Sequence, residues 1–142
     1  MILHTTAELA NLSSIRHFVE DSAQSLSADE QTTYGLSQAV DECATNIIEH
    51  GYRGLPGAIE IEIVRAGDTL TIVLRDHAPP FDPTGAPLPD LSRPLEEREP
   101  GGLGIYLTRQ MVDDWRYRAL PDDGNELTLI KHIKPTTSQA SF

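Results

Sequence analysis

Two polar side chains one helical turn apart, Glu42 and Asn46, are of the types that handle a proton and a cation. Both stand in the helix-like segment "DECATNIIEH". At about 100° per residue they stack together at the edge of that segment's apolar stripe. A carboxylate accepts a proton, and an amide oxygen binds a hard cation such as Mg²⁺. An ordinary polar helix flank has the same spacing, so the pair alone leaves both interpretations open.

A second candidate is the segment "PGGLG", which puts Gly101, Gly102 and Gly104 before an expected helix. Small residues at a helix N-terminus let a phosphate approach free N–H groups. An ordinary Pro-Gly loop is the alternative. A Walker loop is excluded because it needs a lysine after its last glycine, and the only lysines are Lys131 and Lys134.

Protein-kinase signatures are also missing from the sequence. The charge of a bound triphosphate would therefore be met by Mg²⁺, helix-end amides and arginines, of which Arg93 and Arg98 are the obvious candidates.

Asp76 ends the strand-like segment "TLTIVLRD" and begins the stiff turn "HAPPFDP". A carboxylate only accepts hydrogen bonds. At a pocket it can therefore recognise the exocyclic amine of adenine, whereas the oxygen that guanine carries there is repelled. A solvent-facing aspartate in a turn is the alternative.

The remaining reactive residue types indicate packing rather than chemistry. Cys43 falls on a buried stripe and is expected to be a core thiol, and Trp115 is expected in the core. None of the histidines has the spacing of a metal ligand; they are His4, His17, His50, His77 and His132.

Two helices are expected in the first 50 residues. Thr5 and Glu8 match a capping box before a helix, and Ser27 and Glu30 match a second one. The second helix is predicted to run to His50 and to end at Gly51 or Gly54.

Strands dominate the rest of the chain. "AIEIEIV" and "TLTIVLR" predict one antiparallel hairpin, and "WRYRAL" and "ELTLIKHI" predict another. Between them, a loop with seven of the ten prolines precedes a third helix, "GGLGIYLTRQMVDD". The order ααββ, loop, αββ predicts an α/β (α+β) two-layer sandwich, in which helices cover one face of a mainly antiparallel sheet.

Composition narrows the class of protein. A chain of 142 residues is expected to form one domain, and a single cysteine fits a reducing, cytoplasmic environment. No segment suits a membrane span or a signal peptide. The net charge of −11 argues against direct nucleic-acid binding and favours a basic protein partner or a metal-bound nucleotide.

Taken together, "DECATNIIEHGY", "LRDHAPPFDP" and "GGLGIYLTRQMVDDW" resemble the GHKL ATPase superfamily. More closely, they resemble the small anti-sigma factor serine/threonine-protein kinases of bacterial partner-switching systems. The resemblance covers nearly the whole chain and implies a Bergerat-type ATP-binding domain over residues 1–134. It implies a lid at about residues 84–100, and residues 135–142 are expected to be a flexible tail.

The resemblance implies ATP and Mg²⁺ as cofactors and gives roles to single residues. Glu42 matches the general base, Asn46 the magnesium ligand and Asp76 the adenine-binding aspartate. Gly102 and Gly104 match the second glycine box. The expected nucleotide-binding set is completed by Ala78, Phe81, Arg98, Gly101 and Leu103.

Ala78 departs from the family pattern, since the first glycine box usually reads D-x-G. A methyl group there is expected either to be tolerated or to crowd the base and weaken nucleotide binding. The two prolines that follow are expected to offset this by ordering the turn beforehand.

By resemblance, the chain transfers the ATP γ-phosphoryl group to a serine of a STAS-type anti-anti-sigma partner and sequesters a sigma factor. The resemblance leaves open whether it forms a homodimer. A non-catalytic, nucleotide-responsive binding module is the second hypothesis. A sensor histidine kinase is disfavoured because no helical hairpin with a phospho-accepting histidine is expected in this sequence. A topoisomerase or chaperone subunit is disfavoured because no second domain is expected in it.

Overall fold

The computed structural model describes residues 1–85 and 102–133, and for residues 85 and 102–106 the backbone alone. The chain begins with strand β1 (Ile2–Thr6), a 3₁₀ turn η1 (Leu9–Asn11) and helices α1 (Leu12–Ser25) and α2 (Glu30–Asn46). A π-helical turn η2 (Ile47–Gly51) leads into strands β2 (Ala58–Ala66) and β3 (Thr69–Asp76) and the 3₁₀ turn η3 (Pro83–Gly85). Helix α3 (Gly102–Met111) and strands β4 (Asp114–Ala119) and β5 (Asn125–His132) follow.

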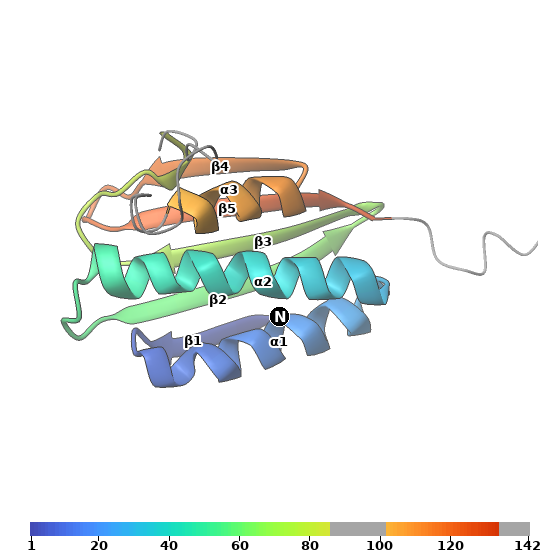
Figure 1. The fold of residues 1–142 in the computed structure, drawn as a ribbon, viewed down its shortest axis with the longest axis horizontal. Helices are drawn as coiled ribbons and strands as arrows, with labels where there is room; N and C mark the ends of the chain where they lie inside the picture. Colours follow the sequence, from blue (N-terminus) through green and yellow to red (C-terminus); the bar gives the residue numbers. More distant parts are fainter. Residues whose placement is uncertain (86–101, 134–142) are drawn as a thin grey trace, which may run out of the picture.

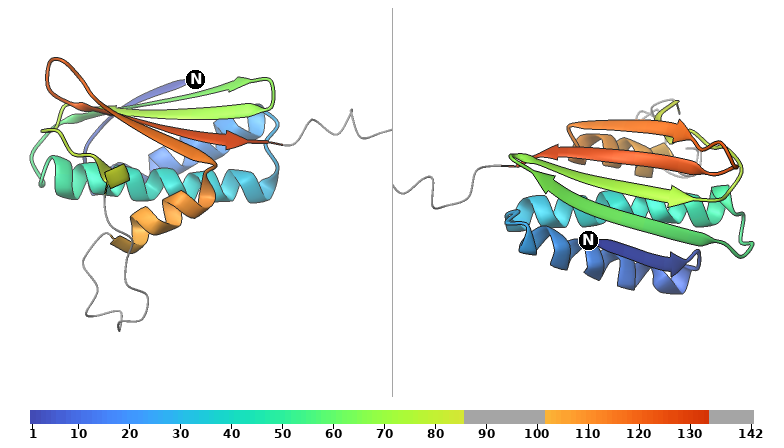
Figure 2. Two further views of the ribbon diagram at one scale, coloured as in Figure 1. Left: turned by 90° about the horizontal axis from the view of Figure 1, so that it is seen from above. Right: turned by 180° about the vertical axis from the view of Figure 1, so that it is seen from behind.

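The strands form one five-stranded sheet in the order β1-β2-β3-β5-β4, and every neighbouring pair is antiparallel. All three α-helices lie on the same face of the sheet, as Figure 1 and the left view of Figure 2 show. The predicted two-layer α/β sandwich with an antiparallel sheet is confirmed.

Strict alternation in β2 decides which side chains enter the core. Ile59, Ile61 and Ile63 are at most 1% exposed, whereas Glu60 and Glu62 are only half-buried and lie on the opposite face. The β2–β3 hairpin closes at Gly67, whose φ of +61° suits a residue without a side chain. The second hairpin, β4–β5, also forms where the sequence predicted it.

The start of the chain differs from its prediction. Residues Ile2–Thr6 form an edge strand paired with β2, and α1 begins only at Leu12. The predicted capping box of Thr5 and Glu8 is therefore wrong. Thr5 lies within β1, and Glu8 precedes a 3₁₀ turn without a side-chain cap.

The second predicted cap is also wrong. Helix α2 starts after Asp29, whose Oδ1 accepts a hydrogen bond from the Thr32 N–H at 2.7 Å. Ser27, with φ of 68°, lies in the connection before it. The end agrees better, because the helical path continues through η2 to Gly51, next to the predicted end at His50.

Two predicted segments fall largely or wholly outside the described residues. Only the beginning of the predicted lid, residues 84–85, and none of the predicted tail, residues 135–142, is described. Among the described helices, none has the length and apolar character to cross a membrane.

One buried hydroxyl in α2 yields a stability prediction. Thr33 is 3% exposed, and its Oγ1 has no hydrogen-bond partner among the described residues. Thr33→Val removes a desolvated polar group at nearly constant volume, so we expect the free energy of unfolding to rise by about 1 kcal/mol. Urea unfolding followed by circular dichroism measures this change.

The matched control is Thr45→Val in the same helix. The Thr45 Oγ1 donates to the carbonyl oxygen of Asp41 at 2.7 Å, so its loss should lower the free energy of unfolding by about 0.5–1 kcal/mol. Equal destabilisation by both substitutions would contradict the prediction.

Candidate functional site

A narrow pocket opens between the inner face of the sheet and the helices α2 and α3. Asn46 and Cys43 of α2 and Thr108 of α3 form part of its wall, and Asp76 and Phe81 contribute from the end of β3 and the turn after it. The pocket therefore brings together three segments that are far apart in the sequence, including three residues predicted for the site: Asn46, Asp76 and Phe81.

Asp76 is 3% exposed at the last position of β3. Its Oδ1 accepts two hydrogen bonds, from the Ala78 N–H at 2.9 Å and from the Asn125 side-chain amide at 2.8 Å. Since both bonds end on Oδ1, within the described part of the chain Oδ2 is the oxygen left to a ligand. Burial raises the pKa of Asp76, and the hydrogen bonds from Asn125 and Ala78 partly oppose this rise.

Asn125, at the start of β5, joins the aspartate to the turn that follows it. Besides Asp76, its amide nitrogen approaches the carbonyl oxygens of Ala78 at 3.3 Å and Pro79 at 3.2 Å. Its Oδ1 accepts from the Phe81 N–H at 2.8 Å and from the Tyr117 hydroxyl at 2.5 Å. One side chain thus satisfies several polar groups of the 76–81 turn and fixes the shape of one pocket wall.

Tyr52 supports the same turn from the other side. Its hydroxyl accepts from the His77 N–H at 2.8 Å and donates to the Ala58 carbonyl at 2.7 Å. Gly124, with φ of +120°, passes so close to Asp76 that a side chain there would collide with the carbonyl oxygen of Asp76. These contacts make the carboxylate a fixed acceptor.

Ala78 fits the place where the family pattern has glycine. Ala78 is not among the residues with positive φ, so its conformation does not require glycine. It is 2% exposed, and its methyl group faces Gly51, where an added Cβ would lie 3.2 Å away. In the described part of the chain Ala78 lies beside the pocket wall without contributing to it.

Asn46 and Glu42 share one face of α2 but differ in their surroundings. Asn46 is 8% exposed and lines the pocket. Glu42 is half-buried one turn earlier, outside the described pocket wall. Burial raises the pKa of Glu42, and the negative charges of Asp41 and Glu49 raise it further. A carboxylate with a raised pKa is suited to take up a proton.

The expected core residues contribute to the pocket as well. Cys43 is buried, as predicted, and burial raises the pKa of its thiol to about 12, which keeps it protonated and unreactive. Trp115 and Tyr117 of β4 are half-buried in the pocket wall, and the Arg109 guanidinium lies 5.9 Å from the centre of the Trp115 ring.

Several predicted site residues cannot be placed in this geometry. Arg98 and Gly101 lie outside the described residues. Gly102, Leu103 and Gly104 form the first turn of α3, which is described by its backbone. Among the described residues, no cluster of three His, Cys, Asp or Glu side chains could hold a metal ion. A cation here would depend on the Asn46 amide oxygen and on oxygens of the ligand.

Sequence reasoning missed Asn125, Tyr117 and Tyr52. Gly124 and Asn125 stand between the predicted strands "WRYRAL" and "ELTLIKHI", and Tyr117 was assigned only to the first of them. The roles of Asn125 and Tyr117 depend on the register Asp76↔Asn125 and Tyr117↔Leu127, which pairs segments about 50 and 10 residues apart. Tyr52 contacts the Ala58 carbonyl and the His77 N–H, which lie 6 and 25 residues away in the sequence. A glycine at the entry of a strand was the one available signal of a close backbone approach.

Comparisons with known proteins identify the family of the chain. The family model "Histidine kinase-like ATPase domain" matches residues 5–131. The serine/threonine-protein kinase BtrW of Bordetella bronchiseptica is 32% identical over 103 residues, which cover 72% of this chain and 72% of BtrW. The serine-protein kinase RsbW of Bacillus cereus is 31% identical over 100 residues, which cover 68% of this chain and 61% of RsbW.

A solved structure supports the fold. The crystal structure of the RsbU and RsbW domains from Mycobacterium tuberculosis superposes with a TM-score of 0.65 at 18% sequence identity. The match covers 96% of this chain and 34% of that chain.

The buried carboxylate leads to a prediction about stability. Because the pKa of Asp76 is raised, its charge lowers the stability of the folded state once the pH exceeds the ordinary value of 3.8. Asp76→Asn keeps the Oδ1 acceptor and removes the charge. We expect the variant to be more stable than the parent by about 0.5–2 kcal/mol at pH 7, with a smaller difference near pH 4.

Chemical denaturation at several pH values measures the effect, and Asp68→Asn in the exposed β2–β3 turn is the matched control. A variant Asp76→Asn that is less stable than the parent at pH 7 would contradict the prediction.

Proposed function

Since the chain belongs to the histidine kinase-like ATPase domain family, we propose that it is an ATP-dependent protein-serine kinase and anti-sigma factor. The observation that carries the proposal is that Asp76 and Asn46 line one pocket. Asp76 offers a fixed carboxylate oxygen for adenine, and Asn46 offers an amide for the phosphate end. The kinases BtrW and RsbW are relatives at 31–32% identity.

The adenine end of the proposed site is formed around Asp76. Its Oδ2 accepts a hydrogen bond from the exocyclic amine of adenine, while the flat base fills the slot beside Phe81 and Leu127. Guanine carries an oxygen at that position and would leave two acceptors facing each other. The base is therefore selected by one acceptor with a fixed direction.

The phosphate end lies along α2 toward Glu42. The Asn46 amide oxygen would hold Mg²⁺, and the first turn of α3 would offer backbone N–H groups at Gly102–Gly104 to the phosphates. When bound, Mg²⁺ supplies positive charge that neutralises the phosphate oxygens. Arg98, outside the described residues, is the proposed side-chain cation for the same oxygens.

Glu42 acts as the general base for the transfer. The serine oxygen of the partner forms a bond to the γ-phosphorus as the bond from that phosphorus to the ADP oxygen breaks, and the serine proton goes to the Glu42 carboxylate. The raised pKa of Glu42 makes it a better proton acceptor than an ordinary glutamate. ADP leaves, and the partner carries phosphoserine.

The proposed partners are a STAS-type anti-anti-sigma protein, as phosphate acceptor, and a sigma factor held inactive. The net charge of −11 suits a partner with basic faces, as DNA-binding proteins have. The chain aligns with 61% of the RsbW length and 72% of the BtrW length. The proposed partners therefore rest on the pocket and the net charge of this chain as well as on these relatives.

A second function is favoured by one observation, because Glu42 lies outside the described pocket wall. In this alternative the chain binds nucleotide and changes its affinity for a partner without transferring phosphate. Nucleotide-dependent complex formation with no phosphoserine on any STAS partner would support it over the kinase.

We expect Glu42→Gln to lower phosphoryl transfer by at least about a hundredfold while changing the Kd for ATP by less than about threefold, because the amide cannot accept the serine proton. Radiolabelled ATP and a STAS protein encoded in the same genome measure transfer, and calorimetry measures binding. In the parent, the transfer rate should fall on acidification at a pH above the ordinary glutamate pKa of 4.5.

Glu30→Gln, an exposed substitution in the first turn of α2, is the control and should leave both quantities unchanged. Normal transfer by Glu42→Gln would show that another group is the base.

We also expect the chain to bind ADP at least about a hundredfold more tightly than GDP. Asp76→Asn should lower the affinity for ADP by about a hundredfold, because the amide Nδ2 then faces the adenine amine as a second donor. Titration calorimetry with both nucleotides measures this, and equal affinity for ADP and GDP in the parent would refute the proposed role of Asp76.

A further inference from the structure

The outer face of the sheet carries one row of ionisable side chains, the charge row, that crosses all five strands. Register places its members side by side: His4 on β1, Glu60 on β2, Arg75 on β3, Glu126 on β5 and Arg118 on β4. Neighbours are within ion-pair distance at each step: His4–Glu60 3.5 Å, Glu60–Arg75 2.6 Å, Arg75–Glu126 2.9 Å and Glu126–Arg118 3.1 Å.

Arg75 is the centre of this charge row. Its guanidinium contacts Glu60 at 2.6 Å and Glu62 at 3.1 Å on β2, and Glu126 at 2.9 Å on β5. The hydrogen bonds to Glu126, Glu60 and Glu62 raise its pKa, so Arg75 stays charged. The side chains are only 18–32% exposed, so water screens them less than it screens surface pairs. Without Arg75, three carboxylates on the two strands β2 and β5 would face one another across β3.

The charge row lies directly behind the pocket. In the sequence, Arg75 precedes Asp76, Glu126 follows Asn125 and Arg118 follows Tyr117. Successive side chains of a strand point to opposite faces, so the two members of each of these pairs lie on opposite faces of the sheet. Arg75 pairs with Glu126, and the next pair in register is Asp76 with Asn125. Each member of the Tyr117–Asn125–Asp76 network therefore has a charged neighbour on the outer face.

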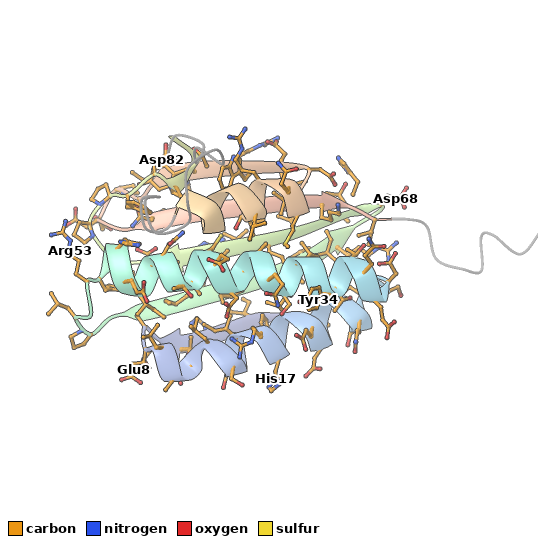
Figure 3. All side chains as sticks on the ribbon, viewed as in Figure 1. Glu8, His17, Tyr34, Arg53, Asp68 and Asp82 are labelled. Carbon is orange, nitrogen blue, oxygen red and sulfur yellow. The ribbon has the colours of Figure 1, made fainter. Side chains whose placement is uncertain are left out.

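At the end of the sheet where Asp76 and Asn125 lie, no turn joins β3 to β5. Asp76 leads into the 77–81 turn, and Asn125 enters β5 from the β4–β5 hairpin, so their hydrogen bond links residues 49 apart in the sequence. At the opposite end, β2 and β3 are held by a tight turn. Figure 3 shows Asp68 of that turn far from Asp82, which follows the pocket turn. At the pocket end, the position of β3 thus depends on contacts with its neighbouring strands.

We propose that Arg75 is a positioning residue for the nucleotide pocket: by binding Glu60 and Glu126 at once, it holds β3 between β2 and β5 so that Asn125 reaches Asp76. The nucleotide part of this inference rests on the proposed function. The structural part, the position of Asp76 and its turn, does not.

The test compares Arg75→Met with Arg65→Met. Arg65 is in β2 beside the β2–β3 turn, where its guanidinium donates to the carbonyl oxygens of Leu26 at 2.6 Å and Gly67 at 2.8 Å. Both substitutions remove a bonded arginine from the sheet, and only one of them lies behind the pocket. Arg75→Lys, which retains a charge that can meet one carboxylate at a time, serves as the milder variant.

Two readouts are measured well below the melting temperature of each variant. Calorimetry gives the Kd for Mg·ADP. In the protein without nucleotide, NMR follows the amide of Ala78, whose N–H donates to Asp76 Oδ1, through its chemical shift and hydrogen-exchange protection. We expect Arg75→Met to weaken ADP binding about tenfold and to lower Ala78 protection about tenfold, Arg75→Lys to give smaller changes, and Arg65→Met to change neither.

The proposal is overturned if folded Arg75→Met, or folded Arg75→Lys where the methionine variant does not fold, keeps the parental Ala78 amide signal and protection. It is equally overturned if Arg65→Met changes them as much. If the parent binds no adenine nucleotide, the proposed function fails, and the Ala78 amide still decides the role of Arg75.

Discussion

A buried carboxylate with one oxygen bound by the protein and one left open is the constraint on which the site depends. Asp76 Oδ1 is held by the Ala78 N–H and by Asn125, so the direction of Oδ2 is set before any ligand arrives. A buried charge is costly unless it is hydrogen-bonded. The surrounding contacts, from Tyr52 under the turn to the bare backbone of Gly124, are what make this burial tolerable and the acceptor rigid.

The sequence predicted the structure best where the pattern within a single strand or helix determines which side chains are buried. Alternation of isoleucine and glutamate fixed β2 and its partner, because one face of that hairpin had to be buried. Helical spacing placed Cys43 in the core and Asn46 at its edge, and the structure has Asn46 in one pocket with Asp76 and Phe81. The chemical roles of these residues stay predictions, as do those of Glu42 and of the glycines at the start of α3.

Other features depended on distant partners and could not be predicted from local patterns. Strand β1 has little alternation of its own and exists because its backbone pairs with β2, so its residues were interpreted as a helix cap. At the start of α2, Ser27 and Asp29 are both residue types that cap helices, and the local pattern favoured Ser27 although Asp29 is the cap. Asn125 and Tyr117 gain their roles from the register of β3, β5 and β4, which no short window contains.

The two faces of the sheet are linked by this register. A strand cannot shift by one residue without exchanging its inner and outer side chains, so an ion pair on the outer face and a hydrogen bond in the pocket constrain the same backbone. Arg75 and Glu126 form an ion pair on the outer face, and the next pair in register, Asp76 and Asn125, forms a hydrogen bond on the inner face. Burial of Asp76 is unfavourable to its charged form, and the ion pairs of Arg75 lie on the opposite face of the sheet, where they take none of the space in the pocket. The geometry of a pocket on one face of an antiparallel sheet is therefore constrained by side chains on the other face.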